Sequence, residues 1–140
     1  MKRAALALIA VSTLVLAAPR WTQDKQAAGG GRARISIYEV APGRHLDFLK
    51  WLAAREEVAR EAGVPATELY AHTDGDRWDY LLIWPMTTAE QDRKVDEMAA
   101  AKGLKTGFPA ALEFRELLSS HTDTFVNGPT TAAALLIAAK

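Results

Sequence analysis

The chain has 140 residues, of which 49% are hydrophobic and 24% are charged, with seventeen basic and seventeen acidic side chains. This is the composition of one globular domain, because disordered chains have fewer apolar residues and a larger net charge. The zero net charge argues against the basic surface that nucleic-acid binding requires. The absence of cysteine excludes disulfides, thiolate nucleophiles and cysteine-bound metals.

The N-terminus has the organisation of a secretory signal peptide. Lys2 and Arg3 precede an uncharged run over residues 4–18, which matches a basic region followed by a hydrophobic one. The run is shorter than the roughly twenty residues that span a bilayer, and Ala17 offers the small residue needed before a cut. We therefore expect a signal peptide over residues 1–18, a mature chain that begins near Ala18, and export to the periplasm or beyond with no lasting membrane anchor. The alternative is an uncleaved N-terminal anchor.

Two segments flank the predicted domain, which covers residues 35–128. Residues 19–34 contain three consecutive glycines and no periodic apolar face, which predicts a flexible linker. Residues 129–140 include an apolar stretch too short to span a membrane. We expect this end to form an arm or a short helix that docks on the domain or on a partner subunit.

The first half of the domain predicts a strand, a helix and a hairpin. Alternation of β-favouring residues over 34–40 predicts the strand, and helical spacing over 44–62 predicts a helix that ends at Gly63. Two further β-like runs, 67–73 and 78–86, are separated by a segment of turn-forming residues. They predict a hairpin.

The second half predicts a pair of helices and a last strand. Thr87 and Glu90 have the spacing of a capping box at the start of a helix that runs to about Lys102. A second helical stretch follows Pro109 and includes Leu117 and Leu118 on its apolar side. The run 121–126 predicts the last strand.

The order of strand, helix, two strands, helix pair and strand is the split βαβ arrangement of the ferredoxin-like α+β fold. In this fold an antiparallel sheet carries its helices on one face. The other face must be covered as well, and pairing with a second copy is the usual way. We therefore expect a homodimer in the form of a dimeric α+β barrel.

Two stretches resemble the dimeric α+β barrel superfamily. ISIYEVAPGRHLDFL is a strand that leads through a Pro-Gly turn into a helix, and HTDTFVNGP is a strand that closes the sheet. This group includes NIPSNAP-like proteins, antibiotic-biosynthesis monooxygenases, stress-responsive A/B barrel proteins and EthD-like proteins. The resemblance implies a pocket between the open sheet face and the long helices. Related proteins use it for cofactor-free oxygenation, haem degradation or isomerisation, although most of the known enzymes are cytosolic.

The predicted hairpin places His72 opposite Asp79, because a tight turn at residues 75–76 pairs positions whose numbers sum to 151. Both would share a sheet face with Tyr70. A carboxylate that holds an imidazole is half of a general-base mechanism, so His72 and Asp79 are the candidate catalytic residues. The alternative is an ordinary polar pair that stabilises the hairpin.

The candidate ligand-pocket residues are Tyr38, Tyr70, His121 and Asp123. Of these, His121 and Asp123 lie on one side of the last strand and would join His72 in a pocket. The spacing of these groups fits no metal-ligand motif, and the glycines lack the helix and lysine of a phosphate loop, so neither a metal nor a cofactor is expected. Two functions remain. The chain binds or transforms a small apolar or aromatic molecule, or it is a non-catalytic structural or partner-binding dimer.

Overall fold

A computed structural model describes residues 31–139 of the chain. The elements, in chain order, are β1 (Gly31–Val40), α1 (His45–Glu61), β2 (Glu68–Ala71), β3 (Tyr80–Pro85), α2 (Ala89–Ala101), α3 (Gly107–Arg115), β4 (Leu118–Gly128) and α4 (Ala132–Ala138). The predicted signal peptide lies outside the described residues, as does the predicted linker up to residue 30. β1 begins at Gly31 rather than at residue 34, so residues 31–33 of the predicted linker belong to the strand. The backbone pairing of Gly31 with Gly128 in β4 requires no apolar pattern.

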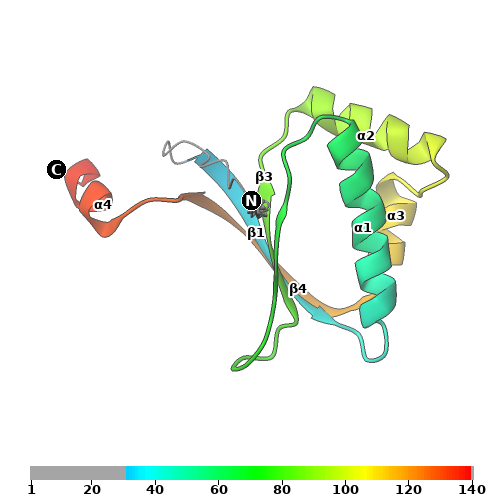
Figure 1. Ribbon diagram of the computed structural model, residues 1–140, viewed down its shortest axis with the longest axis horizontal. Coiled ribbons are helices and arrows are strands. Elements are labelled where there is room, and N and C mark those ends of the chain that lie inside the picture. The colour runs from blue at the N-terminus through cyan, green and yellow to red at the C-terminus, as the bar shows by residue number, and fades with distance from the viewer. Residues whose placement is uncertain (1–30, 140) are drawn as a thin grey trace, which may run out of the picture.

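The sheet has the strand order β2-β3-β1-β4, and each neighbouring pair is antiparallel. This order confirms the predicted ferredoxin-like α+β fold. Helices α1, α2 and α3 lie on one side of the sheet, whereas α4 is set apart from them beyond the far end of β4 (Figure 1). Within residues 31–139, no helix has the length and apolar character needed to cross a membrane.

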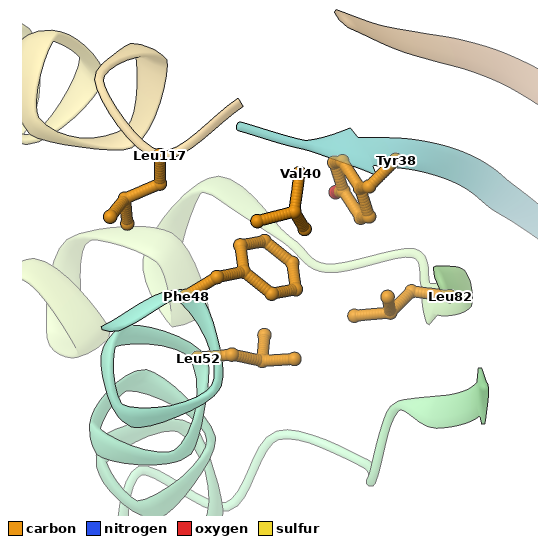
Figure 2. Packing of buried hydrophobic residues seen from close by; sticks show 6 residues of the cluster. All are labelled: Tyr38, Val40, Phe48, Leu52, Leu82 and Leu117. Carbon is orange, nitrogen blue, oxygen red and sulfur yellow. The ribbon is translucent and has the colours of Figure 1, made fainter. Parts of the chain in front are cut away.

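The core forms where α1 packs against the two central strands. Phe48 and Leu52 of α1 point toward Leu82 of β3 and toward side chains of β1 and the α3–β4 connection (Figure 2). Phe48 and Leu82 have no exposed surface, and the Tyr80 ring stacks on Phe48 with 5.3 Å between ring centres. Tyr80 and Leu82 therefore both face the helices, as residues two apart on a strand do.

Helix α2 begins one residue later than the sequence pattern predicts. The capping box is formed by Thr88 and Gln91, whose reciprocal hydrogen bonds measure 3.2 Å and 2.9 Å, and not by Thr87 and Glu90. Both pairs match the same four-residue pattern. The hydroxyl of Thr87 instead donates to the Asp92 carboxylate at 2.6 Å, so Thr87 stabilises the first turn from outside the helix.

Helix α3 is shorter at its C-terminus than predicted, because the sheet takes its last residues. It begins at Gly107, so Pro109 lies in the first turn, where the missing N–H has no helical partner to lose. Leu118 pairs with Val40 and opens β4, and the carbonyl of Leu117 accepts a hydrogen bond from the N–H of Ala41 at 2.9 Å. Their apolar pattern reflects burial in the core rather than helix.

Candidate functional site

The backbone of the hairpin confirms that His72 and Asp79 are cross-strand neighbours. Ala71 pairs with Tyr80, and the N–H of His72 donates to the carbonyl of Asp79 at 2.8 Å. The side chains nevertheless go to different partners. The Asp79 carboxylate accepts from the backbone N–H of Val40 at 2.7 Å, and the His72 ring packs 4.7 Å from the ring centre of Trp78.

This geometry connects β3 to β1 through Asp79. Within residues 31–139, no hydrogen bond joins the two side chains, and the buried Nε2 of His72 has no partner. The predicted general-base pair requires the Asp79 carboxylate in hydrogen-bond contact with the imidazole. The catalytic role of His72 and Asp79 therefore stays a prediction, and the structure gives Asp79 a structural contact.

The strand registers divide the six predicted site residues between the two faces of the sheet. Tyr38 of β1 pairs with Tyr80 on one side and with His121 on the other, so His121 shares the helix-facing side of Tyr80. His72 pairs with Asp79, which is one residue before Tyr80. Successive strand residues point to opposite faces, so His72 and Asp79 lie on the face opposite Tyr80. One chain therefore places the six residues in two groups: Tyr38, His121 and Asp123 toward the helices, and Tyr70, His72 and Asp79 on the open face.

The helix-facing group contains a polar pair and a small aromatic cluster. The Ser36 hydroxyl donates to the Asp123 carboxylate at 2.6 Å, and the rings of Tyr38 and Phe114 lie 6.2 Å and 5.8 Å from the His121 ring. Burial raises the pKa of the Tyr38 hydroxyl above its ordinary value. Tyr38 is therefore neutral at physiological pH and acts as a hydrogen-bonding group, not as a base.

A cavity of about 360 Å³ lies between the helix-facing side of the sheet and helices α1 and α2. The sheet contributes Arg34 from β1, Trp84 from β3 and Phe125 from β4, while Ala59 of α1 and Val95 of α2 face them across the cavity. The wall is thus mainly aromatic and aliphatic. The volume is that of a site for a small organic molecule.

Two buried hydrogen-bond donors border this cavity. Within residues 31–139, neither Nε of Arg34 nor Nε1 of Trp84 has a hydrogen-bond partner, and the Arg34 guanidinium carbon lies 5.2 Å from the centre of the Trp84 ring. The Trp84 indole is near enough to the Tyr38 hydroxyl to oppose the rise of its pKa, but the two groups do not reach hydrogen-bonding geometry. Both donor atoms are thus buried in the wall of the cavity and expose almost no surface to it.

Arg34 and Trp84 were not among the predicted site residues. Strand alternation places Arg34 on the same side of β1 as Ser36 and Tyr38, which face the core. An arginine at a core-facing position was the available signal, because charged side chains are seldom buried without a partner. Strand alternation places Trp84 on the same side of β3 as Tyr80 and Leu82, but a tryptophan in the core and one that lines a cavity give the same sequence pattern.

A second cavity, of about 440 Å³, lies between α1 and α3. An ion-pair network borders it, although the buried Nε of Arg55 has no hydrogen-bond partner within residues 31–139. The Glu113 carboxylate accepts from the Trp51 indole at 3.2 Å and pairs with Arg55 at 3.8 Å and Lys105 at 3.7 Å. This network holds the two helices together. Across the described part of the chain, no group of three or more histidine, aspartate or glutamate side chains is arranged to hold a metal ion.

No family model matches the chain, and no curated protein matches it. Solved structures with a similar fold include a NIPSNAP domain protein from Burkholderia xenovorans, with a TM-score of 0.43, 13% identity and coverage of 73% of this chain and 97% of that one. SnoaB, a cofactor-independent oxygenase from Streptomyces nogalater, has a TM-score of 0.45 and 16% identity, with coverage of 72% of this chain and 95% of that one. A dimeric ferredoxin-like protein of unknown function from Bacteroides fragilis has a TM-score of 0.44 and 12% identity, with coverage of 72% of this chain and 99% of that one. These likenesses concern the fold alone.

Proposed function

We propose that the protein binds a small apolar or aromatic molecule in the cavity between the sheet and helices α1 and α2. The observation that carries this proposal is the cavity itself, about 360 Å³ in volume and lined by Trp84, Phe125 and aliphatic side chains. Aromatic rings that flank an apolar volume favour a planar or hydrocarbon ligand, because both partners leave water on binding. The aromatic and aliphatic lining supports binding, and binding without a chemical step is the function proposed.

The experiment is a titration of the purified protein with phenylnaphthylamine, a neutral aromatic dye whose fluorescence rises in apolar surroundings. Val95→Phe places a ring in the cavity, and we expect the dye to bind about tenfold more weakly, as for other losses of a well-fitted apolar contact. Ala100→Phe, on the exposed side of the same helix, is the matched control and should bind as the parent does. Equal dye binding by the parent protein and Val95→Phe would contradict the proposal.

A homodimer formed through the open face of the sheet is part of the same proposal. Ile35 pairs with Ile83, and Ile37 with Leu81, so four large apolar side chains lie together on the face opposite the helices. All four remain partly exposed in a single chain. An apolar patch of this kind on the two central strands is typical of a self-association surface.

The second candidate function, binding to another protein, is favoured by α4. Its Leu135, Leu136 and Ile137 side chains are 59%, 69% and 75% exposed, and the helix projects away from the rest of the chain (Figure 1). Exposed leucine and isoleucine on a projecting helix fit a docking element. Export of the protein, expected from the leader, is also proposed, and it would place either activity outside the cytoplasm.

A further inference from the structure

We infer that two copies of the chain join along β4, so that each β4 runs antiparallel beside that of its partner and His121 meets Asp123 of the partner subunit. This inference rests on the homodimer that is part of the proposed function. It adds the strand that joins the copies, the register of that strand, and a histidine–carboxylate pair that neither chain forms alone. Three observations carry it: the free edge of β4, the direction of its backbone groups, and the spacing of His121 and Asp123.

The outer edge of β4 has no partner in the single chain. β4 is the last strand in the order β2-β3-β1-β4, and within residues 31–139 it pairs with β1 alone. Edge strands are usually protected from further pairing by being short or by carrying lysine or proline. The opposite edge strand, β2, has four residues, whereas β4 has eleven and contains neither lysine nor proline. The β4 edge is therefore the one suited to accept another strand.

The backbone groups that reach this edge belong to His121 and Asp123. The carbonyl of Tyr38 accepts a hydrogen bond at 2.8 Å from the N–H of the residue before β3, so the backbone groups of Tyr38 point toward β3. Those of the preceding residue, Ile37, then point toward β4, where Ile37 pairs with Thr122. Thr122 thus uses its N–H and C=O inside the sheet, and its two neighbours direct theirs outward.

The spacing of His121 and Asp123 selects one register for two identical strands. In a twofold dimer the same residues face each other in reverse order, so an axis at Thr122 places His121 opposite the partner's Asp123, and by symmetry this occurs twice. An axis at Asp123 would set two carboxylates against each other, which is destabilising. An axis at any other residue of β4 would leave His121 without a facing carboxylate.

Both side chains have the capacity for this contact. The Asp123 carboxylate accepts the Ser36 hydroxyl through Oδ1 at 2.6 Å, and its second oxygen can accept another donor. An imidazole offers an N–H whether it is neutral or protonated. In the described part of the single chain, no ion pair joins His121 to Asp123. The partner strand therefore supplies the acceptor that His121 lacks.

The same axis agrees with coverage of the open face. A twofold axis perpendicular to β4 keeps the helices of both copies on one side of the joined sheet and the open faces on the other. Because sheets twist, a sheet made from two four-stranded sheets can curl until its open faces enclose each other. The histidine–carboxylate pair then lies on the helix-facing side, beside the rings of Tyr38 and Phe114 at 6.2 Å and 5.8 Å. Each of the two resulting sites contains residues from both chains.

Single cysteines test the register, because the chain has none of its own. Thr122→Cys would place two thiols across the axis, at about 4.5 Å between Cα atoms, within the range of about 4.4–6.8 Å that a disulfide bridges. We expect copper phenanthroline to convert this variant to a covalent dimer. Thr124→Cys is the matched control, since Thr124 is equally exposed and on the same face of β4. Its two copies would lie roughly 14 Å apart and should stay unlinked.

Exchanging the two charged positions tests the pair itself. His121→Asp sets carboxylate against carboxylate at both sites, and we expect the dissociation constant of the dimer, from a light-scattering dilution series, to rise at least about tenfold. Combining it with Asp123→His restores opposite partners and should bring the constant back to within about threefold of the parent value. His45→Asp, at the exposed start of α1, is the control for net charge and should dimerise as the parent does.

A parent dimer that leaves Thr122→Cys unlinked, or that links Thr124→Cys alone, would overturn this inference while the proposed dimer stood. An equal loss of affinity in His45→Asp and His121→Asp would also overturn it, because the effect would then come from net charge. A monomeric parent protein would refute the dimer and this inference together. Should the combined variant not fold, the two cysteine variants still decide the register.

Discussion

The carboxylate of Asp79 accepts a hydrogen bond from the backbone N–H of Val40 at 2.7 Å and so joins the start of β3 to the end of β1. Asp79→Ala leaves this partly buried N–H without a partner, and we expect the free energy of unfolding to fall by about 1–3 kcal/mol. Asp79→Asn should cost less, because the amide oxygen can still accept.

Urea unfolding of the two Asp79 variants, with His72→Ala as the comparison, measures this effect. In the structure His72 contributes its ring contact with Trp78, and a cross-strand contact of this kind is worth about 1 kcal/mol or less. A larger loss for His72→Ala than for Asp79→Ala would show that Asp79 is not the main link. If His72 instead acts as a base, His72→Ala would abolish activity without changing the unfolding curve.

Phe48 is the centre of the core, and its removal should be the most damaging single change on α1. It has no exposed surface and touches the rings of Tyr38 and Tyr80. Phe48→Ala is expected to lower the free energy of unfolding by about 3–5 kcal/mol, the usual cost of truncating a buried phenylalanine. Leu46→Ala, two residues earlier and 63% exposed, should change it by about 0.5 kcal/mol or less. Similar losses for both variants would contradict the packing in Figure 2.

The raised pKa of Tyr38 predicts a loss of stability at high pH. Burial favours the neutral phenol in the folded chain, so above the ordinary value of 10.0 the unfolded chain releases its proton first. The folded state then binds more protons than the unfolded state, and stability falls as pH rises toward the folded pKa. The contribution is fully present below that range.

Urea unfolding measured from about pH 9 to about pH 11 tests this expectation. Tyr38→Phe has no proton to release and should lose less stability over this interval than the parent protein. Tyr70, whose hydroxyl donates to Glu68 at 2.7 Å and whose pKa is also raised, mainly by that bond, is present in both proteins and cancels in the comparison. Parallel pH profiles for the two proteins would rule out Tyr38 as the source.

The order of elements and the hairpin register follow from local patterns, and both were predictable. The pairing of His72 with Asp79 needed only the turn position and the alternation of the strand. The partner of the Asp79 carboxylate was not predictable, because it depends on where β1 ends relative to β3, which is a tertiary relation. The capping box was misplaced by one residue because Thr87 and Thr88 both satisfy the motif, and the hydroxyl of Thr87 found Asp92 instead.

The candidate site was predicted less well than the fold. His121 and His72 were expected in one pocket, but their position on opposite faces follows from the pairing of β4 with β1, which joins residues about eighty apart in the sequence. Arg34 was predicted at the boundary between the linker and the first strand, because its neighbours Gly31 and Ala33 carry little strand propensity. Its place in the cavity comes from the sheet that β1 forms with β3 and β4.

Cleavage of the leader gives an experiment on the predicted export. The basic residues, the apolar run and the small residues at its end occur in the order that signal peptidase recognises. We expect exported protein to have the intact mass of a chain that begins at Ala18. Replacing the small residue before the cut, as in Ala17→Leu, should block processing, whereas Ala10→Leu in the apolar run should not. Exported protein that retains the full-length mass would contradict cleavage.

The dimer proposal predicts that a charge on the open face separates the subunits. Ile37 lies at the centre of the apolar patch, beside Leu81 on β3, and Ile37→Asp would place a carboxylate in the interface, where it has no partner and loses its hydration. Light scattering at micromolar concentration should give a dimer mass for the parent protein and a monomer mass for Ile37→Asp, with circular dichroism to confirm that the variant folds. Leu136→Asp, on the projecting α4, is the matched control and should remain dimeric. A monomeric parent protein would refute the dimer, and a monomeric Leu136→Asp beside a dimeric Ile37→Asp would move the contact from the sheet to α4.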